Sequence, residues 1–257
     1  MRPDRRLWGS RTASRERCIL LVGKGFGQTG KVSGTAGQND DFSWQDLTNT
    51  MRERLSVKLL KILFLAVSKL AWRIQYEGLE NLPNDSEKGF VIASNHQTYI
   101  DPVWIGIPIR RDLKFLAWDK AFHWPIIGFL MRWLGSLPVN TSTGRNPDSL
   151  KRAVESLQNG SCLVIFPEGA REFENGEPLE FKMGAVALAS EAKVHILPAS
   201  IIGGNSIWPR DWKWPRLGKV TVRFHPMIEV PVISDETRKT RLREITEVLR
   251  KIVTESQ

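Results

Sequence analysis

The chain has 257 residues, of which 41% are apolar and 25% are charged, and its formal net charge is +9. This composition is typical of a globular protein with a sizeable core, and it excludes a fully disordered chain or a collagen. Two cysteines, Cys18 and Cys162, are too few for a disulfide framework. Cys162 lies in an apolar run, so we expect it to be reduced and buried. The positive charge indicates an anionic partner, which is a nucleic acid, an anionic lipid, a phosphorylated substrate or an acidic carrier protein.

Residues 1–50 differ in composition from the rest of the chain. They hold eight Lys or Arg and five Asp or Glu, and their glycine-rich stretches lack apolar periodicity. We therefore expect this segment to be irregular or disordered. Its basic opening is compatible with an organelle transit peptide, and the alternative is upstream sequence that precedes a true start at Met51.

One segment imitates a phosphate-binding loop. Residues 25–31 match the G-x4-G-K pattern and follow a short apolar run. Such a loop needs Ser or Thr next, to bind magnesium, and then a helix whose N-terminus faces the phosphate. Position 32 is Val32 and the following residues are poor helix formers, so we do not expect nucleotide binding here.

Residues 51–73 are expected to form an amphipathic helix, within a membrane-docking segment 51–74. Its longest uncharged run, Ile62–Ser68, is far shorter than the ~18–20 residues that span a bilayer. Lys58, Lys61 and Lys69 interrupt the apolar residues, a composition that suits a membrane interface. Packing of this helix on the domain core is the alternative.

The segment 75–257 alternates short apolar strands with helical patterns. This alternation predicts an α/β fold with a mixed, largely parallel sheet flanked by helices. We expect strands over 89–93, 113–117, 161–166, 195–201 and 219–224, and helices from 101, over 125–134, over 148–158, over 184–191 and over 236–254.

A candidate acid–base pair follows the strand 89–93. His96 comes just after the carboxyl end of that strand, where α/β proteins place their sites. Asp101 follows with four residues between them, and we expect it to cap a helix that has Pro102 in its first turn. The carboxylate then reaches one imidazole nitrogen and leaves the other for a substrate, which is the arrangement of a general base. The same spacing also arises at ordinary helix starts.

A candidate anion site follows the strand 161–166. Glu168, Gly169 and Arg171 lie on the next loop, where Arg offers a fork of donors for phosphate and Gly allows a close backbone approach. Lys182 precedes a helix that starts at Gly184 and is expected to add positive charge. A plain turn with a solvent-exposed Arg is the alternative.

Taken together, these blocks resemble the glycerolipid acyltransferase family, and are most similar to its lysophosphatidic acid acyltransferases. The resemblance covers about residues 75–230 in the family's order. The departures are in the second block, where Trp118 replaces a common Lys and the usual Arg is missing after Gly135, and in the third, where Ala170 and Glu172 replace Thr and Ser. The matching residues are Asn95, His96 and Asp101, then Lys114 and Phe115, then Phe166–Gly169 and Arg171, then Phe181, Lys182 and Gly184, and Leu197–Ala199.

The resemblance implies direct acyl transfer from acyl-CoA or acyl carrier protein to lysophosphatidic acid, which yields phosphatidic acid. His96 would be the base and Asp101 would orient it, with no metal and no cofactor. The implied substrate-binding residues are Asn95, Lys114, Glu168, Gly169, Arg171 and Lys182. Other acceptors stay open: glycerol 3-phosphate, a lysophospholipid or an ornithine lipid. A non-catalytic basic lipid-binding protein is a further alternative.

A lipid substrate implies a membrane surface as partner. Besides the helix, the apolar segment 124–134 and the segment 207–216, which holds three Trp and three basic residues, suit a headgroup layer. We expect a peripheral or monotopic protein on the cytoplasmic face of a membrane, with an organelle not excluded. Recognisable nucleic-acid-binding modules are missing from the sequence, so nucleic acid is not an expected partner.

Overall fold

The computed structural model describes residues 44–83, 89–123, 125–133, 136–139, 147–171, 179–209, 212–233 and 237–255. The chain divides into two units, Met1–Trp44 and Gln45–Gln257. Everything below concerns the second unit. Cys18 and the glycine-rich segment 25–31 lie outside the described residues.

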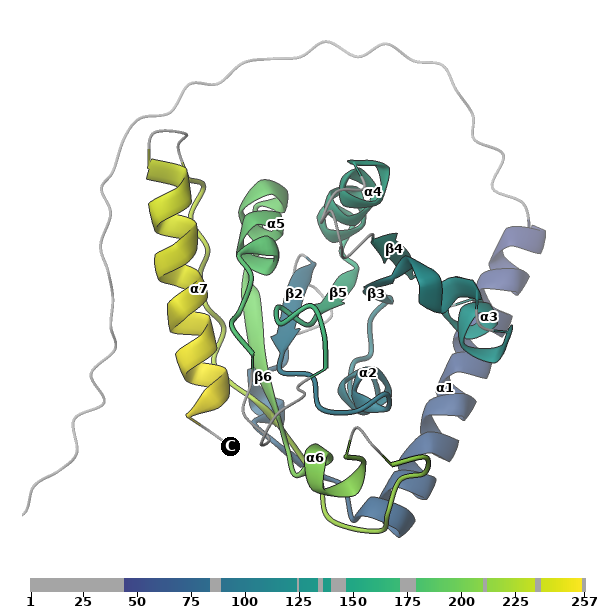
Figure 1. Cartoon of the computed structure of the whole chain (residues 1–257). Coiled ribbons are helices and arrows are strands. Elements are labelled where there is room, and N and C mark those ends of the chain that lie inside the picture. The colour runs from purple at the N-terminus through teal and green to yellow at the C-terminus, as the bar shows by residue number, and fades with distance from the viewer. Residues whose placement is uncertain are drawn as a thin grey trace, which may run out of the picture. The chain divides into compact units, whose positions relative to one another are not determined.

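A single sheet of seven described strands forms the centre of the second unit (Figure 1). Five neighbouring strands run parallel, and β7 pairs antiparallel with β6 and carries β1 at the edge. This arrangement confirms the predicted mixed, largely parallel sheet. In spatial order the strands are β1 (Gln75–Glu77), β7 (Thr221–Phe224), β6 (Ile196–Ile202), β2 (Phe90–Ser94), β5 (Cys162–Ile165), β3 (Leu113–Trp118) and β4 (Leu137–Val139).

Helices cover both faces of the sheet because its central strands are apolar on both sides. On β2, Val91 and Ala93 face one core cluster, while Phe90 and Ile92 face the other. The first cluster packs against α4 (Pro147–Gln158), α5 (Gly184–Ala192) and α7 (Arg238–Thr254), and the second against α1 (Trp44–Trp72) and α2 (Asp101–Gly106). The remaining described helices are η1 (Leu79–Asn81), η2 (Asp119–His123), α3 (Pro125–Trp133) and α6 (Gly204–Ile207).

Helix α1 begins at Trp44, so the boundary expected at residue 50 falls inside it. One side of the helix packs on the sheet: Ser68 is fully buried and accepts a hydrogen bond from Trp104 Nε1 at 3.2 Å. Lys61 also lies on this side, where its Nζ donates to the carbonyl of Ile109 at 2.6 Å. Burial lowers the pKa of Lys61. Lys61 therefore differs from Lys58 and Lys69, whose side chains are exposed.

The other side of α1 exposes apolar residues. Leu59, Leu63 and Leu70 are 59%, 60% and 88% exposed. One side of the helix thus packs on the core, which was the alternative to membrane docking, while the other side leaves an apolar face exposed. Within the described residues, we find no helix whose length and apolar character suffice to cross a bilayer.

Cys162 is a buried free thiol, which confirms the expectation from its apolar surroundings. Its burial raises the pKa of the thiol to about 12. The thiol is therefore almost entirely protonated at neutral pH, and it acts as a small core side chain.

A buried polar link joins β6, β7 and α7. The hydroxyl of Ser200 donates to the carbonyl of Val253 at 2.8 Å, and it lies 2.8 Å from His225 Nε2. Because the hydroxyl proton is committed to Val253, His225 must donate from Nε2. Burial lowers the pKa of His225, and the charge of Arg223 acts in the same direction.

This link predicts a loss of stability in mild acid. The folded state binds fewer protons than the unfolded state once the pH falls below the ordinary histidine pKa of 6.5, so the free energy of unfolding decreases there. Melting temperatures measured between about pH 7.5 and about pH 5.5 should fall less steeply for His225→Gln, whose amide still donates but does not titrate. Equal pH dependence in the two proteins would contradict this role of His225.

Candidate active site

The two loops that carry the candidate site residues leave adjacent strands, β2 and β5. The chain continues from β2 into α2 on one face of the sheet, and from β5 towards α5 on the other. In the sheet, the connection after β2 leads past β5 to β3, whereas the connection after β5 leads past β2 to β6. The boundary between β2 and β5 is therefore a topological switch point. Such a switch point opens a crevice at the carboxyl ends of the strands, where open α/β sheets bind their ligands.

His96 and Asp101 form the pair expected from their spacing. Nδ1 of His96 lies 2.9 Å from Oδ2 of Asp101, and the Asp101 carboxylate is fully buried. That carboxylate also accepts hydrogen bonds from the backbone N–H groups of Gln97 and Thr98, at 2.6 and 2.7 Å, and from the Thr98 hydroxyl at 2.6 Å. Four donors thus satisfy a buried charge that would otherwise be very unfavourable.

The predicted N-cap role of Asp101 is wrong. Asp101 is the first residue of α2, and Ile100 occupies the cap position without a side-chain hydrogen bond. The carboxylate turns back towards the preceding loop instead, because three donors of Gln97 and Thr98 converge on it there. This orientation brings the carboxylate to His96 as well.

The imidazole of His96 is held on a second side by Phe166. The two rings stack with centroids 4.0 Å apart and an interplanar angle of 19°. The His96 side chain is 18% exposed, and its Nδ1–H donates to Asp101, which leaves Nε2 as the proton acceptor. Asp101 is the one side chain hydrogen-bonded to this imidazole among the described residues, so no serine or cysteine nucleophile is paired with it there.

Glu168 ties the two loops together. Its Oε1 accepts the backbone N–H of His96 at 2.8 Å, and its Oε2 accepts the N–H of Leu179 at 3.0 Å. The residue is only 3% exposed. Its carboxylate therefore orders the backbone under His96, and the expected role in binding the acceptor needs correction.

Gly169 and Lys182 lie against each other, as expected for parts of one site. Gly169 closes a turn, donating its N–H to the carbonyl of Phe166 at 3.0 Å, and has a φ of 71° that favours glycine. A Cβ at this position would come within 2.6 Å of Lys182 Nζ. Glycine therefore lets the ammonium group approach the loop closely.

Arg171 follows on the same loop and stacks on an aromatic ring. Its Cζ lies 3.5 Å from the centroid of the Tyr99 ring. Tyr99 belongs to the loop between β2 and α2, three residues after His96. Sequence reasoning named Arg171 but missed Tyr99, whose only signal was an aromatic residue inside the spacer between His96 and Asp101.

Asn95 does not present its side chain to a ligand. It is 1% exposed, and its amide pairs with the backbone of Ile201 on β6 through hydrogen bonds of 2.9 and 2.7 Å. Both ends of the amide are thereby engaged, so the expected substrate-binding role is corrected to one of joining β2 to β6.

Lys114 lies at the wrong end of its strand. It is the second residue of β3, which runs parallel to β5, whereas His96 lies beyond the opposite ends of these strands. Its Nζ donates to Ser156 Oγ at 3.0 Å and lies 3.8 Å from Asp112. The expected substrate-binding role of Lys114 is therefore corrected. Gly135, from the second sequence block, lies outside the described residues.

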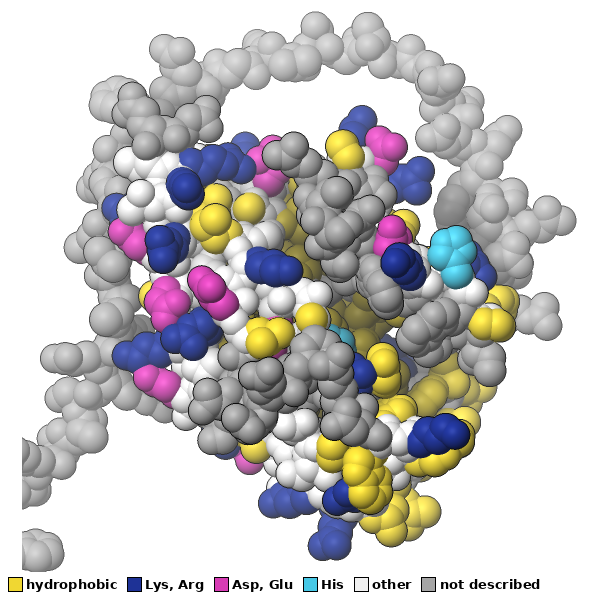
Figure 2. Space-filling model, viewed as in Figure 1, with side chains coloured by type: hydrophobic (Ala, Val, Ile, Leu, Met, Phe, Trp, Pro, Cys, Tyr) yellow, Lys and Arg dark blue, Asp and Glu magenta, His cyan; other side chains and the backbone are white. Residues whose placement is uncertain are grey.

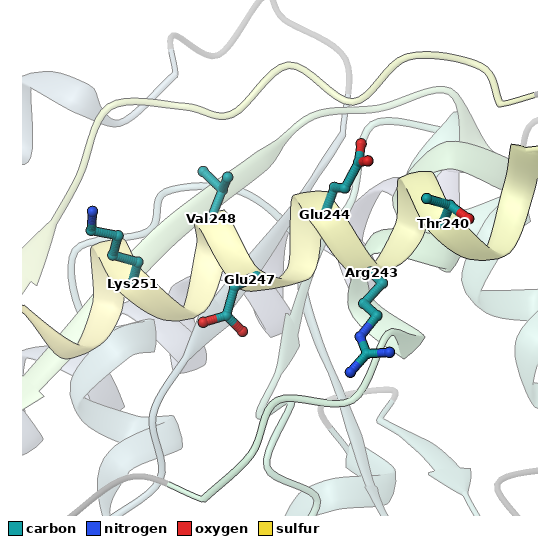
Figure 3. A pocket seen from close by; sticks show the side chains of 6 residues that line it. All are labelled: Thr240, Arg243, Glu244, Glu247, Val248 and Lys251. Carbon is teal, nitrogen blue, oxygen red and sulfur yellow. The ribbon is translucent and has the colours of Figure 1, made fainter.

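Metal binding finds no support in the described ranges, where no three His, Cys, Asp or Glu side chains come together as a ligand set. A shallow hollow does run along α7 (Figure 3). Its lining comes from that helix alone and the side chains point to different sides, so it does not enclose a ligand. The lining residues are Thr240, Arg243, Glu244, Glu247, Val248 and Lys251.

Comparison of the sequence with known protein families gives a match that covers the site. Residues 73–202, just over half of the chain, match the family model described as acyltransferase. The chain belongs to the acyltransferase family. The matched range begins at the end of α1 and ends with β6, so it includes both loops of the site.

Similar proteins carry more specific names. The chain is 35% identical over 139 residues to the chloroplastic 1-acyl-sn-glycerol-3-phosphate acyltransferase of Arabidopsis thaliana, and the match covers 54% of this chain and 38% of that protein. It is 33% identical over 128 residues to the 1-acyl-sn-glycerol-3-phosphate acyltransferase of Bacillus subtilis, covering 49% of this chain and 61% of that one. The chain thus spans less than two thirds of either relative.

A solved structure shares the fold. The crystal structure of the 1-acyl-sn-glycerophosphate (LPA) acyltransferase PlsC from Thermotoga maritima aligns with a TM-score of 0.53 and 26% sequence identity. The alignment covers 68% of this chain and 69% of that one.

The position of Glu168 predicts that its charge matters for stability. In Glu168→Gln, the amide nitrogen faces one of the two backbone N–H donors and cannot accept its hydrogen bond. The loss of this buried hydrogen bond should lower the free energy of unfolding by about 1–3 kcal/mol. Urea unfolding measures this loss. Glu180→Gln is the matched control, because Glu180 is exposed, and it should change stability by less than about 0.5 kcal/mol. Equal effects of the two changes would contradict the assigned role.

Proposed function

We propose that this protein transfers a fatty acyl group from acyl-CoA or acyl carrier protein to the free hydroxyl of lysophosphatidic acid, which yields phosphatidic acid. One observation carries the proposal: the oriented His96–Asp101 pair lies beside a loop that holds Arg171 and Lys182. The names of the relatives supply the acceptor class. They do not distinguish the two acyl donors.

The His96–Asp101 pair suits direct transfer to an alcohol. Nε2 of His96 removes the proton from the acceptor hydroxyl, while Asp101 holds the imidazole and stabilises its charged form. The oxygen attacks the thioester carbonyl, the carbon–sulfur bond then breaks, and the proton passes to the departing sulfur. The thiol and the ester are the two products. The acyl thioester is a co-substrate, and the scheme needs no cofactor.

Positive charge beside this pair suits the acceptor's phosphate. Arg171 offers a planar set of N–H donors that matches phosphate oxygens, and Lys182 adds a point charge at Gly169. The Glu168 carboxylate on the same loop is engaged by two backbone N–H donors. A glycerol phosphate headgroup is therefore favoured over an uncharged acceptor.

Substitution of His96 tests the proposed chemistry. His96→Ala should lower formation of phosphatidic acid by about 10²–10⁴-fold, since a general base typically contributes that much. Asp101→Asn should also be severe, because the amide does not stabilise the imidazolium. Product is measured from labelled acyl-CoA, and separately from acyl carrier protein, with lysophosphatidic acid.

His195→Ala is the matched control for this experiment. His195 is exposed and precedes β6, at the end of the sheet opposite to the site, so its loss should leave turnover unchanged. Near-normal turnover in His96→Ala would overturn the proposal. An acceptor panel with glycerol 3-phosphate, lysophospholipid and ornithine lipid establishes which hydroxyl is used. A preference for one of these over lysophosphatidic acid would replace the acceptor.

We further propose that the protein docks on the membrane that holds its acceptor, as a peripheral or monotopic protein. Figure 2 shows hydrophobic side chains gathered over α1 and beside α6, at the lower right. From α1 the surface includes Leu59, Leu63 and Leu70, and from the loop after α6 it includes Trp214 and Leu217, which are 77% and 82% exposed.

Backbone contacts join these two parts of the surface. The N–H of Gly218 donates to the carbonyl of Ala71 at 3.2 Å, and Trp72 Nε1 donates to the carbonyl of Arg216 at 2.9 Å. The loop after α6 is thereby fixed at the end of α1. An apolar surface of this kind, flanked by the exposed Lys58 and Lys69, suits the interface of an anionic bilayer. In α3, Phe129 is also exposed, while Trp124 and Leu134 lie outside the described residues.

The two sides of α1 predict different effects of its lysines. Lys58→Gln with Lys69→Gln should weaken binding to anionic vesicles at low salt, by about 1 kcal/mol for each charge. Vesicle sedimentation measures the binding. Lys61→Gln removes the same charge from the side that faces the sheet, so it should leave vesicle binding unchanged. Docking through this surface is contradicted if Lys61→Gln weakens binding as much as either of the other changes.

A further inference from the structure

Tyr99 lies at the meeting point of the two loops of the site. It follows His96 by three residues on the loop after β2, and its ring lies under Arg171 from the loop after β5. The ring is 48% exposed, although the neighbouring Gln97, Thr98 and Asp101 are buried. A half-exposed aromatic ring contributes little to the core, so its contact with Arg171 is the notable feature of its position.

The Tyr99 ring is held in place from two directions. On one side, the backbone of the two preceding residues is fixed by the Asp101 carboxylate. On the other, the Trp208 ring contacts Tyr99 edge-on, with centroids 5.5 Å apart and an interplanar angle of 70°. Trp208 is itself anchored, because its Nε1 donates to the carbonyl of Trp212 at 2.9 Å and its side chain packs against a core cluster. The Tyr99 ring is therefore restrained before any ligand binds.

Stacking and phosphate binding use different parts of a guanidinium group. The aromatic ring attracts its flat face, whereas phosphate oxygens accept hydrogen bonds from the N–H groups at its edge. At 3.5 Å the Arg171 guanidinium lies in contact with the Tyr99 ring. This contact restricts the rotamers of a long side chain, so less conformational entropy is lost when the phosphate binds.

We propose that Tyr99 is a positioning residue, which holds the Arg171 guanidinium over its ring for the acceptor's phosphate and thereby determines affinity for the acceptor. This inference rests on the proposed function, since it names a residue behind the phosphate contact of the same site. Tyr99 does not touch the reacting atoms in this scheme. Its effect falls on the binding of the acceptor, and the binding of the acyl donor and the acyl-transfer step do not depend on it.

The test compares Tyr99→Leu with Tyr99→Phe. The Leu variant loses the ring, and its KM for lysophosphatidic acid should rise by about three- to thirtyfold, the range of a cation–π contact. Its KM for the acyl donor and its kcat should stay within about twofold of the wild type. The Phe variant keeps the ring face and should behave like the wild type. A general disturbance of the fold would instead change all three parameters, and melting temperatures check this directly.

A double-mutant cycle shows whether Tyr99 acts through Arg171. If it does, Tyr99→Leu should add no further rise in KM when introduced into Arg171→Gln, because the group that it positions is already gone. Full additivity of the two changes would overturn the proposal. Equal KM values for lysophosphatidic acid in the wild type and Tyr99→Leu would also overturn it, as would a loss of acceptor affinity in Tyr99→Phe equal to that in the Leu variant.

Direct titration with a short-chain lysophosphatidic acid separates this inference from the proposed function. Weaker binding by Tyr99→Leu, with wild-type binding by Tyr99→Phe, supports the role without any turnover. If the wild type acylates lysophosphatidic acid and Tyr99→Leu binds it equally well, the inference fails and the proposed function stands. If the wild type neither binds nor acylates it, both fail.

Discussion

The buried carboxylate of Asp101 is the interaction on which the rest of the site depends. Its four hydrogen-bond donors come from His96, Gln97 and Thr98, so a single side chain shapes the whole loop after β2. A buried carboxylate that lost these partners would be strongly destabilised, and the loop is therefore held in one conformation. Glu168 acts in the same way from the neighbouring loop, where it accepts the backbone N–H of His96. Two buried acids thus organise the backbone of the two loops that carry His96 and Arg171.

Helix α1 links the catalytic core to the surface proposed to meet the membrane. Its inner side packs through Ser68 on Trp104 of α2 and through Trp72 on the same core cluster, and these contacts set its position. Its outer side then presents leucines to the solvent at a fixed orientation. Docking through this side would bring the loops after β2 and β5 to a membrane in a defined orientation, because helix and sheet belong to one packed unit.

Much of this fold follows from local patterns in the sequence. Apolar runs bounded by Gly, Pro and Asn predicted the main strands within a residue or two, because strands buried on both faces must be continuously apolar. The three-residue strands β1 and β4 were not foreseen, since so short a segment carries no periodicity. The pairing of His96 with Asp101 was also accessible, because both residues lie on one loop and only their spacing decides whether they meet.

The sequence by itself determined which residue types lie at the strand ends, namely a His–Asp pair after β2 and a loop with Arg171 after β5. The tertiary structure alone decided what each remaining polar residue contacts. Asn95 pairs with a backbone group 106 residues away, and Glu168 with one 72 residues away. Lys61 contacts a carbonyl 48 residues away, and Tyr99 meets Arg171 across two loops. The sequence does not show whether the partner of a polar side chain is a ligand or a distant backbone group. That partner comes within hydrogen-bonding distance only when the strands and helices pack together.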